Sequence, residues 1–436
     1  MGVLLFANYF FYARWGLTLL VLIPAAASCD YVFGLGLQSS KSNLVRRLLI
    51  AASVLMNLGI LVFFKYTPFL LQNWAHFKGT EEPGKRAWAL PISVSFYVFQ
   101  ALTYTIDLYR RDSKGTKSYL AYLTAVSFFP TTLAGPITRV SSLIDQMEKR
   151  KPLDPADGGR ALFLIGMGLV KKLMIADYLA VTLVNRVFDF PNLYTGSEVL
   201  VAAYAYSLQI YFDFSGYTDI ATGSALLLGI KLPVNFNAPY AAATIADFWR
   251  RWHITLSNWL RDYLYFSLGG ARSKWRPYLN LTITMVLGGL WHGASWNFVL
   301  WGALHGVGLA IVRLWQTWRG TAPATGVWRV LSILLTFHFV TFAWIFFRAP
   351  NFEIAAAVLS RIGSVTVSFA NVPSAMWVIL GIALAGHYVP KKWYESAMNA
   401  FVRAPFYAQA AVLAALVEGL QYVARTGAAP FIYTNF

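Results

Sequence analysis

The sequence is poor in charge: only 13% of its 436 residues are Asp, Glu, Lys or Arg, whereas 57% are hydrophobic. A soluble domain has about 25% charged residues. Because half that content cannot cover a molecule surrounded by water, most of the surface must face another medium. The composition excludes an ordinary soluble globular protein and predicts a polytopic membrane protein.

Cysteine is almost absent. Cys29 is the only one, which excludes disulfides within the chain and metal sites built from several thiolates. The sequence also lacks the charged start of a secretory signal peptide, and Arg14 interrupts the apolar run of residues 1–27. We therefore expect the first apolar segment to be retained as a helix.

Acidic residues are scarce beside basic ones, 19 against 36, which gives a formal net charge of +17. We expect this excess in cytoplasmic loops that face anionic membrane lipids, and we expect no nucleic-acid partner because no soluble basic domain is present. Part of the excess could line a pocket for an anionic cofactor. Basic residues in loops 38–47 and 110–117 place both loops in the cytoplasm, and residues 1–12, which have none, outside. The loop 65–86 departs from this pattern because it carries four basic residues on the side predicted to be external.

Long apolar segments dominate the chain. A spanning helix needs about 20 mainly apolar residues, and about 11 segments approach this length. They are residues 16–32, 48–64, 88–108, 161–184, 198–212, 217–230, 278–290, 297–315, 327–347, 373–388 and 406–423. Since no internal repeat or long linker separates them, we expect a single integral membrane domain over residues 1–436.

Three stretches are unsuited to plain spanning helices. Residues 119–137 contain two prolines and a glycine, which break helical hydrogen bonding and predict a re-entrant or interfacial segment. Residues 230–240 contain two prolines and two asparagines and predict irregular chain. Residues 244–264 begin with a capping pattern at Thr244 and mix charged with aromatic side chains, which predicts one interfacial or inward-dipping helix.

Polar and ionisable residues gather between residues 209 and 306, and in a membrane such residues usually mark a functional site. Asp213 and Asp219 flank Ser215–Gly216, where we expect the helix to break and to present both carboxylates to a cavity. A proton or cation pathway would also use such residues, so a transporter is an alternative. The three histidines outside this region are expected to be hydrogen-bonded packing residues: His76, His338 and His387.

His292 lies beside Gly288, Gly289 and Gly293, where other backbone or a ligand can approach closely. Its place in an apolar segment, at a helix end or break, suits a buried neutral imidazole, the form that a general base requires. His305 lies 13 residues further on and would point about 140° away on one continuous helix. We therefore expect no shared metal site.

His253 follows Arg250 and Arg251 directly. On one helix Arg250 and Arg261 share a stripe, and Asp247 can pair with Arg251 at i,i+4. The functional interpretation is an anion cradle beside a second histidine, suited to phosphates. The alternative is that these basic side chains reach toward lipid headgroups.

Four motifs stand in order along this region: Gln209–Asp219 (QIYFDFSGYTD), Phe248–Ser257 (FWRRWHITLS), Leu260–Tyr265 (LRDYLY) and Gly289–Gly293 (GLWHG). Together with residues 64–66, 90–100, 129–136, 170–177 and 431–436, they resemble the membrane-bound O-acyltransferases. The resemblance is greatest to the bacterial branch that contains the alginate O-acetyltransferase membrane subunits, and the teichoic-acid D-alanyl transfer proteins are more distant.

The resemblance implies an all-α polytopic membrane protein, with about 11 transmembrane helices and additional re-entrant or interfacial helices around a central funnel. It implies that His292 is catalytic and that His253 is the second active-site histidine. Acyl transfer from a thioester to a hydroxyl needs a base, which we expect to be His292, with backbone N–H groups or the Trp291 indole facing the oxyanion. His253, Asn258 or Asn297 would orient the donor or acceptor.

The implied activity is transfer of acetyl from cytoplasmic acetyl-CoA to hydroxyls of an extracytoplasmic polysaccharide, in the bacterial inner membrane. Arg250 and Arg251 would meet the phosphates of the donor, and Asp213 and Asp219 are further candidates for binding the donor or substrate. The resemblance also implies a periplasmic or surface-anchored acyltransferase partner, and we expect no permanently bound cofactor or metal. Two alternatives stay open: a transporter or acyl-conducting channel that uses Asp213 and Asp219 without covalent chemistry, and an acyltransferase that acts on a protein or lipid, including D-alanyl transfer.

Overall fold

The part of the chain that the computed structural model describes is built from helices and loops, with no β-strand among residues 1–14, 16–80, 94–149, 152–272, 275–320, 322 and 324–424. This confirms the predicted all-α class. Residues 88–93 of a predicted span, the end of the loop 65–86 and the motif at 431–436 lie outside the described residues.

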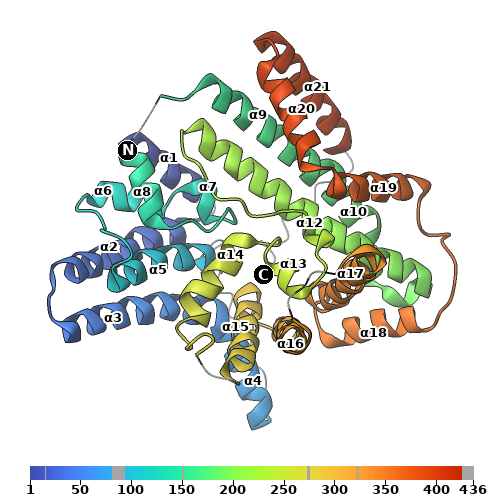
Figure 1. Cartoon of the computed structure of the whole chain (residues 1–436), viewed down its shortest axis with the longest axis horizontal. Coiled ribbons are helices and arrows are strands. Elements are labelled where there is room, and N and C mark those ends of the chain that lie inside the picture. The colour runs from blue at the N-terminus through green and yellow to red at the C-terminus, as the bar shows by residue number, and fades with distance from the viewer. Residues whose placement is uncertain are drawn as a thin grey trace. The chain divides into compact units, whose positions relative to one another are not determined.

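The chain packs as two compact units, and Figure 1 labels most of their α-helices. The first consists of Met1–Leu153 and Ser224–Pro233, and the second of Asp154–Gly223 and Val234–Phe436. The single membrane domain expected over residues 1–436 stays a prediction, and the two units are described in turn.

The first unit is centred on three helices that pack pairwise against one another: α2 (Leu17–Ser39), α3 (Asn43–Leu61) and α5 (Val94–Arg110). Buried polar groups join them, because Asp30 on α2 accepts hydrogen bonds from Ser53 (2.6 Å) and Asn57 (2.9 Å) on α3. The unit also contains α1 (Gly2–Ala13), η1 (Val62–Tyr66), α4 (Thr67–Lys78), α6 (Tyr119–Val126), α7 (Phe129–Thr132) and α8 (Val140–Glu148).

The stretch 119–137 is broken, as its prolines predicted. Helix α6 ends at Val126, the four-residue α7 carries Pro130 in its first turn, and no helix resumes until Val140. A β-carbon on Gly135 would overlap the carbonyl oxygen of Pro130, so the chain turns back on itself more tightly than a larger residue permits.

The second unit holds the polar region. Its first half contains α9 (Pro155–Leu169), the π-helices η2 (Val170–Ala176) and η3 (Ala180–Val184), α10 (Asp177–Leu179), α11 (Asn185–Asp189), η4 (Pro191–Leu193) and most of α12 (Gly196–Leu227). Its second half contains η5 (Pro239–Ala241), α13 (Ile245–Trp249), α14 (Ile254–Trp259), η6 (Leu260–Tyr265), α15 (Arg276–His292), α16 (Trp296–Arg319), α17 (Gly326–Arg348), α18 (Phe352–Gly363), α19 (Ser374–Tyr388), α20 (Lys391–Arg403) and α21 (Phe406–Ala424).

Helix α12 corrects one prediction. It runs through all 32 residues of Gly196–Leu227, about 48 Å at 1.5 Å per residue, and does not break at Ser215–Gly216. The expected spans 198–212 and 217–230 are therefore one helix as far as Leu227. Gly216 serves helix packing instead, since a β-carbon there would lie 2.7 Å from the carbonyl oxygen of Gly168 on α9.

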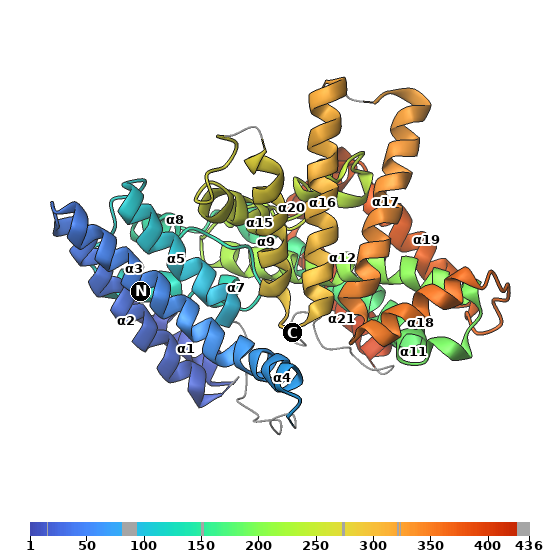
Figure 2. The same ribbon diagram turned by 90° about the horizontal axis from the view of Figure 1, so that it is seen from below.

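Four stretches within the described residues are helical, long and apolar enough to cross a membrane: Leu20–Ser39, Asn43–Lys78, Trp296–Arg319 and Gly326–Arg348. Figure 2 shows the last two, α16 and α17, side by side. The pair Lys391–Arg403 and Phe406–Gln421, which is bent by 120°, adds a fifth if it forms one broken span. The expected total of about 11 crossings and the central funnel stay predictions.

Candidate active site

His292 is the last residue of α15, which confirms its predicted place at a helix end. Three residues separate α15 from α16, and the two helices pack closely as an antiparallel pair because glycines line their contact. β-Carbons on Gly289 and Gly302 would overlap the backbone carbonyl oxygens of Phe298 and Met285 in the opposite helix. The glycine-rich stretch therefore brings the start of α16 directly against His292.

The imidazole of His292 lies among aromatic rings, and the residue is only 3% exposed. Ring centroids of Trp291, Trp301 and Phe347 lie 4.9, 5.1 and 5.3 Å from that of His292. These rings come from the ends of α15 and α17 and from the second turn of α16. They form an apolar wall around the imidazole.

His253 precedes α14 and adopts the left-handed backbone conformation, with φ 42° and ψ 54°. The irregular segment before η5 holds it there: the N–H of Ile254 donates to the Asn235 carbonyl, and the Asn235 side chain accepts from the N–H and hydroxyl of Thr255 (3.2 and 2.9 Å). Burial lowers the pKa of His253 to about 3, so its imidazole is neutral.

The two predicted histidines meet at one indole. The Trp291 ring lies 6.2 Å from the His253 ring and 4.9 Å from the His292 ring, measured between centroids. Phe214 of α12 packs against the other side of this cluster, 4.6 Å from His253. The structure therefore brings together His292, His253 and Trp291, all named from the sequence.

A third histidine joins the same cluster. His305 lies on α16, not on one continuous helix with His292, and its ring is 4.8 Å from that of Trp301. Its Nδ1 accepts a hydrogen bond from the Trp249 indole N–H (3.3 Å), while its buried Nε2 has no hydrogen-bond partner within the described part of the chain. No group of three or more His, Cys, Asp or Glu side chains in that part is arranged to hold a metal ion.

Asp213 and Asp219 are not presented to a cavity by a helix break, because α12 is continuous there. Each is paired with a lysine from η2: Lys172 Nζ lies 2.8 Å from Asp213 Oδ1, and Lys171 Nζ lies 2.6 Å from Asp219 Oδ2. Lys172 also lies 2.7 Å from Asp177. The carboxylates thus fasten η2 to α12, and a role for them in binding the donor stays a prediction.

Residues 244–264 were predicted to form one helix, but the helix is interrupted. α13 ends at Trp249, and α14 begins only after the left-handed residue His253. Both local predictions at its start are confirmed: the Thr244 hydroxyl caps the helix by accepting from the Asp247 N–H (3.0 Å), and Asp247 pairs with Arg251 (3.0 Å). The turn separates Arg250 from Arg261, so they do not form one helical stripe.

The remaining predicted site residues differ in burial. Arg250 and Asn258 are exposed, whereas Arg251 is half-buried in its pair with Asp247. Asn297 is buried and donates from Nδ2 to the carbonyl of Ala349 (2.8 Å). This bond joins the start of α16 to the end of α17. The predicted role of Asn297 in orienting the donor or acceptor stays a prediction.

Sequence reasoning did not assign Lys171, Lys172 and Asn235 to the site region. A signal for the lysines was present, because two adjacent ammonium groups in an apolar segment need anionic partners. Nothing local identified Asn235 as the residue that holds the chain at His253. Of the other histidines, His387 is buried and accepts from the Tyr240 N–H, which confirms its predicted role. His338 bonds to Tyr204 but is exposed, and His76 is exposed as well.

The family model of the membrane-bound O-acyltransferases matches residues 44–355. The chain is 41% identical over 360 residues to the probable alginate O-acetylase AlgI of Pseudomonas aeruginosa, covering 81% of this chain and 68% of the relative. It is 36% identical over 392 residues to the peptidoglycan O-acetyltransferase of Helicobacter pylori, covering 82% and 72%. A teichoic acid D-alanyltransferase of Bacillus subtilis is 31% identical over 245 residues, covering 52% and 61%. The chain therefore belongs to the membrane-bound O-acyltransferase family and is a multi-pass membrane enzyme that transfers acyl groups to hydroxyl groups.

Proposed function

We propose that this enzyme transfers acetyl from cytoplasmic acetyl-CoA to hydroxyl groups of an extracytoplasmic polysaccharide, with His292 as the general base. The observation that carries the proposal is the cluster in which His292 ends α15 among three aromatic rings and shares Trp291 with His253. The names of the relatives, which act on alginate and on peptidoglycan, support a polysaccharide acceptor.

In this reaction the acceptor oxygen attacks the thioester carbonyl while His292 removes the hydroxyl proton. The C–O bond forms, the C–S bond breaks, and the proton on the imidazole passes to the departing CoA sulfur. A positioned base of this kind contributes about 10² to 10⁴ in rate. The Trp291 indole N–H is a candidate donor to the oxyanion, and the aromatic wall limits access of water, which would hydrolyse the thioester.

Arg250 is the better candidate of the two arginines for the donor phosphates. It is exposed on the turn that leads to His253, whereas the guanidinium of Arg251 is already paired with Asp247. Because bidentate guanidinium contacts suit phosphate oxygens, Arg250 would hold the donor near the two histidines. The enzyme would work in the bacterial inner membrane with a periplasmic or surface-anchored acyltransferase partner that completes the transfer.

D-alanyl transfer is a weaker candidate than acetyl transfer. The D-alanyltransferase of Bacillus subtilis matches about half of this chain, whereas the acetylating relatives match four fifths of it at higher identity. The alternative of a channel without chemistry is also weaker, because Asp213 and Asp219, the carboxylates that suggested an ion pathway, are paired with lysines.

The test compares surface glycans from cells that lack the gene and carry wild type, His292→Gln or His76→Gln. Mass spectrometry should find O-acetyl groups restored by wild type and by the His76 variant, whose histidine is exposed, but not by His292→Gln. Purified wild-type protein should also release free CoA from acetyl-CoA, which a channel would not. Near-normal acetylation by a folded His292→Gln protein would refute the assignment of the base.

A further inference from the structure

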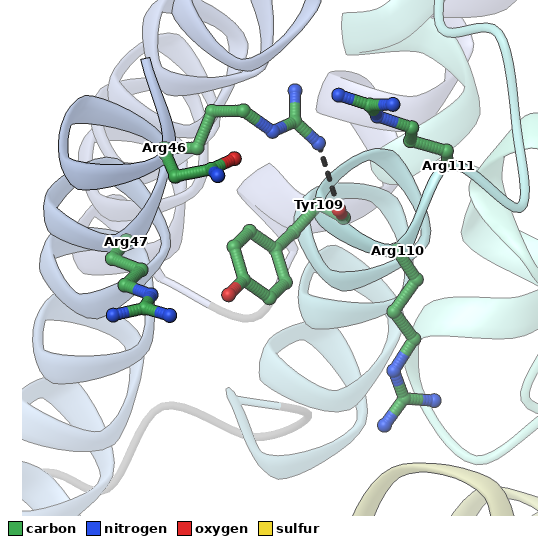
Figure 3. Close-up of a pocket in the computed structure, with 6 residues that line it drawn as sticks. Arg46, Arg47, Tyr109, Arg110 and Arg111 are labelled. Carbon is green, nitrogen blue, oxygen red and sulfur yellow. Dashed lines mark hydrogen bonds between the residues drawn. The ribbon is translucent and has the colours of Figure 1, made fainter.

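A hollow of about 380 Å³ lies in the first unit, where the start of α3 meets the end of α5 (Figure 3). Four of its six lining residues are arginines and none is acidic: Asn43, Arg46, Arg47, Tyr109, Arg110 and Arg111. The two loops that enter the hollow, 38–47 and 110–117, are those that the sequence places together in the cytoplasm. Nothing in the proposed acyl-transfer chemistry uses these residues.

Arg46 shapes the hollow without being available to a ligand. It is 6% exposed, and its guanidinium donates to the carbonyls of Leu37, Leu108 (3.0 Å) and Tyr109 (2.7 Å; Figure 3). These carbonyls lie in the last turns of α2 and α5, where carbonyl groups lack partners within the helix. Arg46 thus fixes the ends of two helices to the start of α3.

The other three arginines face solvent around this fixed centre. Arg47 extends from α3, and Arg110 and Arg111 extend from the end of α5, on different sides of the Tyr109 ring (Figure 3). The N-terminal end of α3 adds the positive end of a 19-residue helix dipole at Asn43. All these contributions favour an anion, and guanidinium groups from two helices suit the oxygens of a phosphate.

An apolar face begins at the hollow and follows α3 away from it. Its exposed side chains recur at helical spacing on the face that carries Arg47: Leu44 (67% exposed), Leu48 (62%), Leu55 (70%), Leu58 (43%) and Val62 (45%). From residue 44 to residue 62 this face is about 27 Å long, close to the thickness of a bilayer's hydrocarbon core. A free phosphate would need no such face, whereas a lipid would place its acyl chains on it.

We propose that this hollow binds the phosphate group of an anionic phospholipid of the cytoplasmic leaflet, whose acyl chains lie along the apolar face of α3. The lipid would hold the α2–α3–α5 bundle at a set depth in the membrane. This inference is independent of the proposed acetyl transfer.

The test measures lipid binding to the purified full-length protein in detergent by native mass spectrometry. Wild type should bind phosphatidylglycerol in preference to phosphatidylcholine, and Arg47→Gln/Arg111→Gln should weaken phosphatidylglycerol binding by about thirtyfold. The matched control, Lys41→Gln/Lys114→Gln, removes the same charge from the same two loops outside the hollow and should bind nearly as wild type. Arg46 is intact in both, so both proteins should keep the wild-type melting temperature.

Four outcomes would overturn the proposal. Equal loss in the arginine and lysine variants would show general attraction to basic loops, not a site. The apolar face would be shown to take no part if an equal concentration of glycerol phosphate displaced the lipid. The same conclusion would follow if the Leu44→Ser/Leu48→Ser variant bound the lipid as well as wild type does. If the arginine variant melts early, Arg47→Lys/Arg111→Lys replaces it. This pair keeps the charge but not the forked donor, and wild-type binding by it would refute recognition of the phosphate by the guanidinium groups of Arg47 and Arg111.

Discussion

Replacing Lys172 with methionine should destabilise the second unit more than replacing either of its acidic partners. The Lys172 ammonium lies 2.7 Å from Asp177 and 2.8 Å from Asp213, and the three side chains are only 15%, 4% and 2% exposed. The group carries one positive and two negative charges. Removing the lysine leaves two buried carboxylates without their shared cation, whereas Asp213→Asn leaves the neutral pair of Lys172 and Asp177.

The size of the effect follows from these distances. At an effective dielectric constant of about 20, each contact contributes roughly 6 kcal/mol of attraction, which the cost of removing the ions from water largely offsets. Breaking a buried pair by deleting one partner typically costs about 3–5 kcal/mol. We expect the loss of stability to lie at the upper end of this range for Lys172→Met and at or below its lower end for Asp213→Asn. At about 2 °C per kcal/mol for a unit of this size, the melting temperatures should fall by roughly 10 °C and 5 °C.

The assay is thermal unfolding of the purified protein in detergent, followed by tryptophan fluorescence. The double variant Lys172→Met/Asp213→Asn should melt above Lys172→Met alone, because removing one carboxylate relieves the repulsion that the lost lysine leaves behind. Lys171→Met is the matched control: its pair with Asp219 is more exposed, at 17% and 20%, so its loss should cost less. Equal melting temperatures for Lys172→Met and Asp213→Asn, or a double variant less stable than both, would refute this reasoning.

Two further predictions concern the site itself. Gly289→Ala should lower both folded yield and acetylation, because its β-carbon would overlap a backbone carbonyl of α16. Gly288→Ala should be tolerated, because its β-carbon meets only the flexible end of a leucine at 3.2 Å. Yield in detergent and glycan acetylation distinguish the two variants. His253→Asn should have a melting temperature close to that of wild type, because asparagine accepts the left-handed conformation at φ 42°. His253→Val should melt several degrees lower. Similar melting temperatures for the two variants would show that this backbone geometry is not required.

The sequence predicted those parts of the site that depend on neighbouring residues. The Thr244 cap and the Asp247–Arg251 pair span three and four positions, and both are present. His292 was placed at a helix end because glycines surround it, and it ends α15. In each case the interacting groups lie within one or two helical turns, so spacing along the chain determines their geometry.

The errors arose where distant segments decide the local structure. Gly216 suggested a break in α12, but the backbone of α9 fills the space that the missing side chain leaves, and the helix continues. In contrast, residues 244–264 were expected to form one helix. Asn235 accepts from the Ile254 and Thr255 N–H groups, so the chain turns at His253 instead. Neither partner could be identified from the local pattern.

Asn297 shows how a residue can affect the surroundings of His292 through helix packing. Its amide donates to the carbonyl of Ala349, two residues after Phe347, whose ring centroid lies 5.3 Å from that of His292. The same bond ties the end of α17 to the first turn of α16, while the glycine contacts with α15 fix the second turn, which carries Trp301. Two of the three rings around the His292 imidazole are therefore positioned by one amide and a row of glycines. If Asn297 were replaced, the buried carbonyl of Ala349 would lose its donor, which costs about 1–3 kcal/mol of stability. The aromatic rings around His292 would then be held less firmly, although the imidazole itself is unchanged. The sequence motif singles out His292, but contacts between three helices determine the shape of the space around its imidazole.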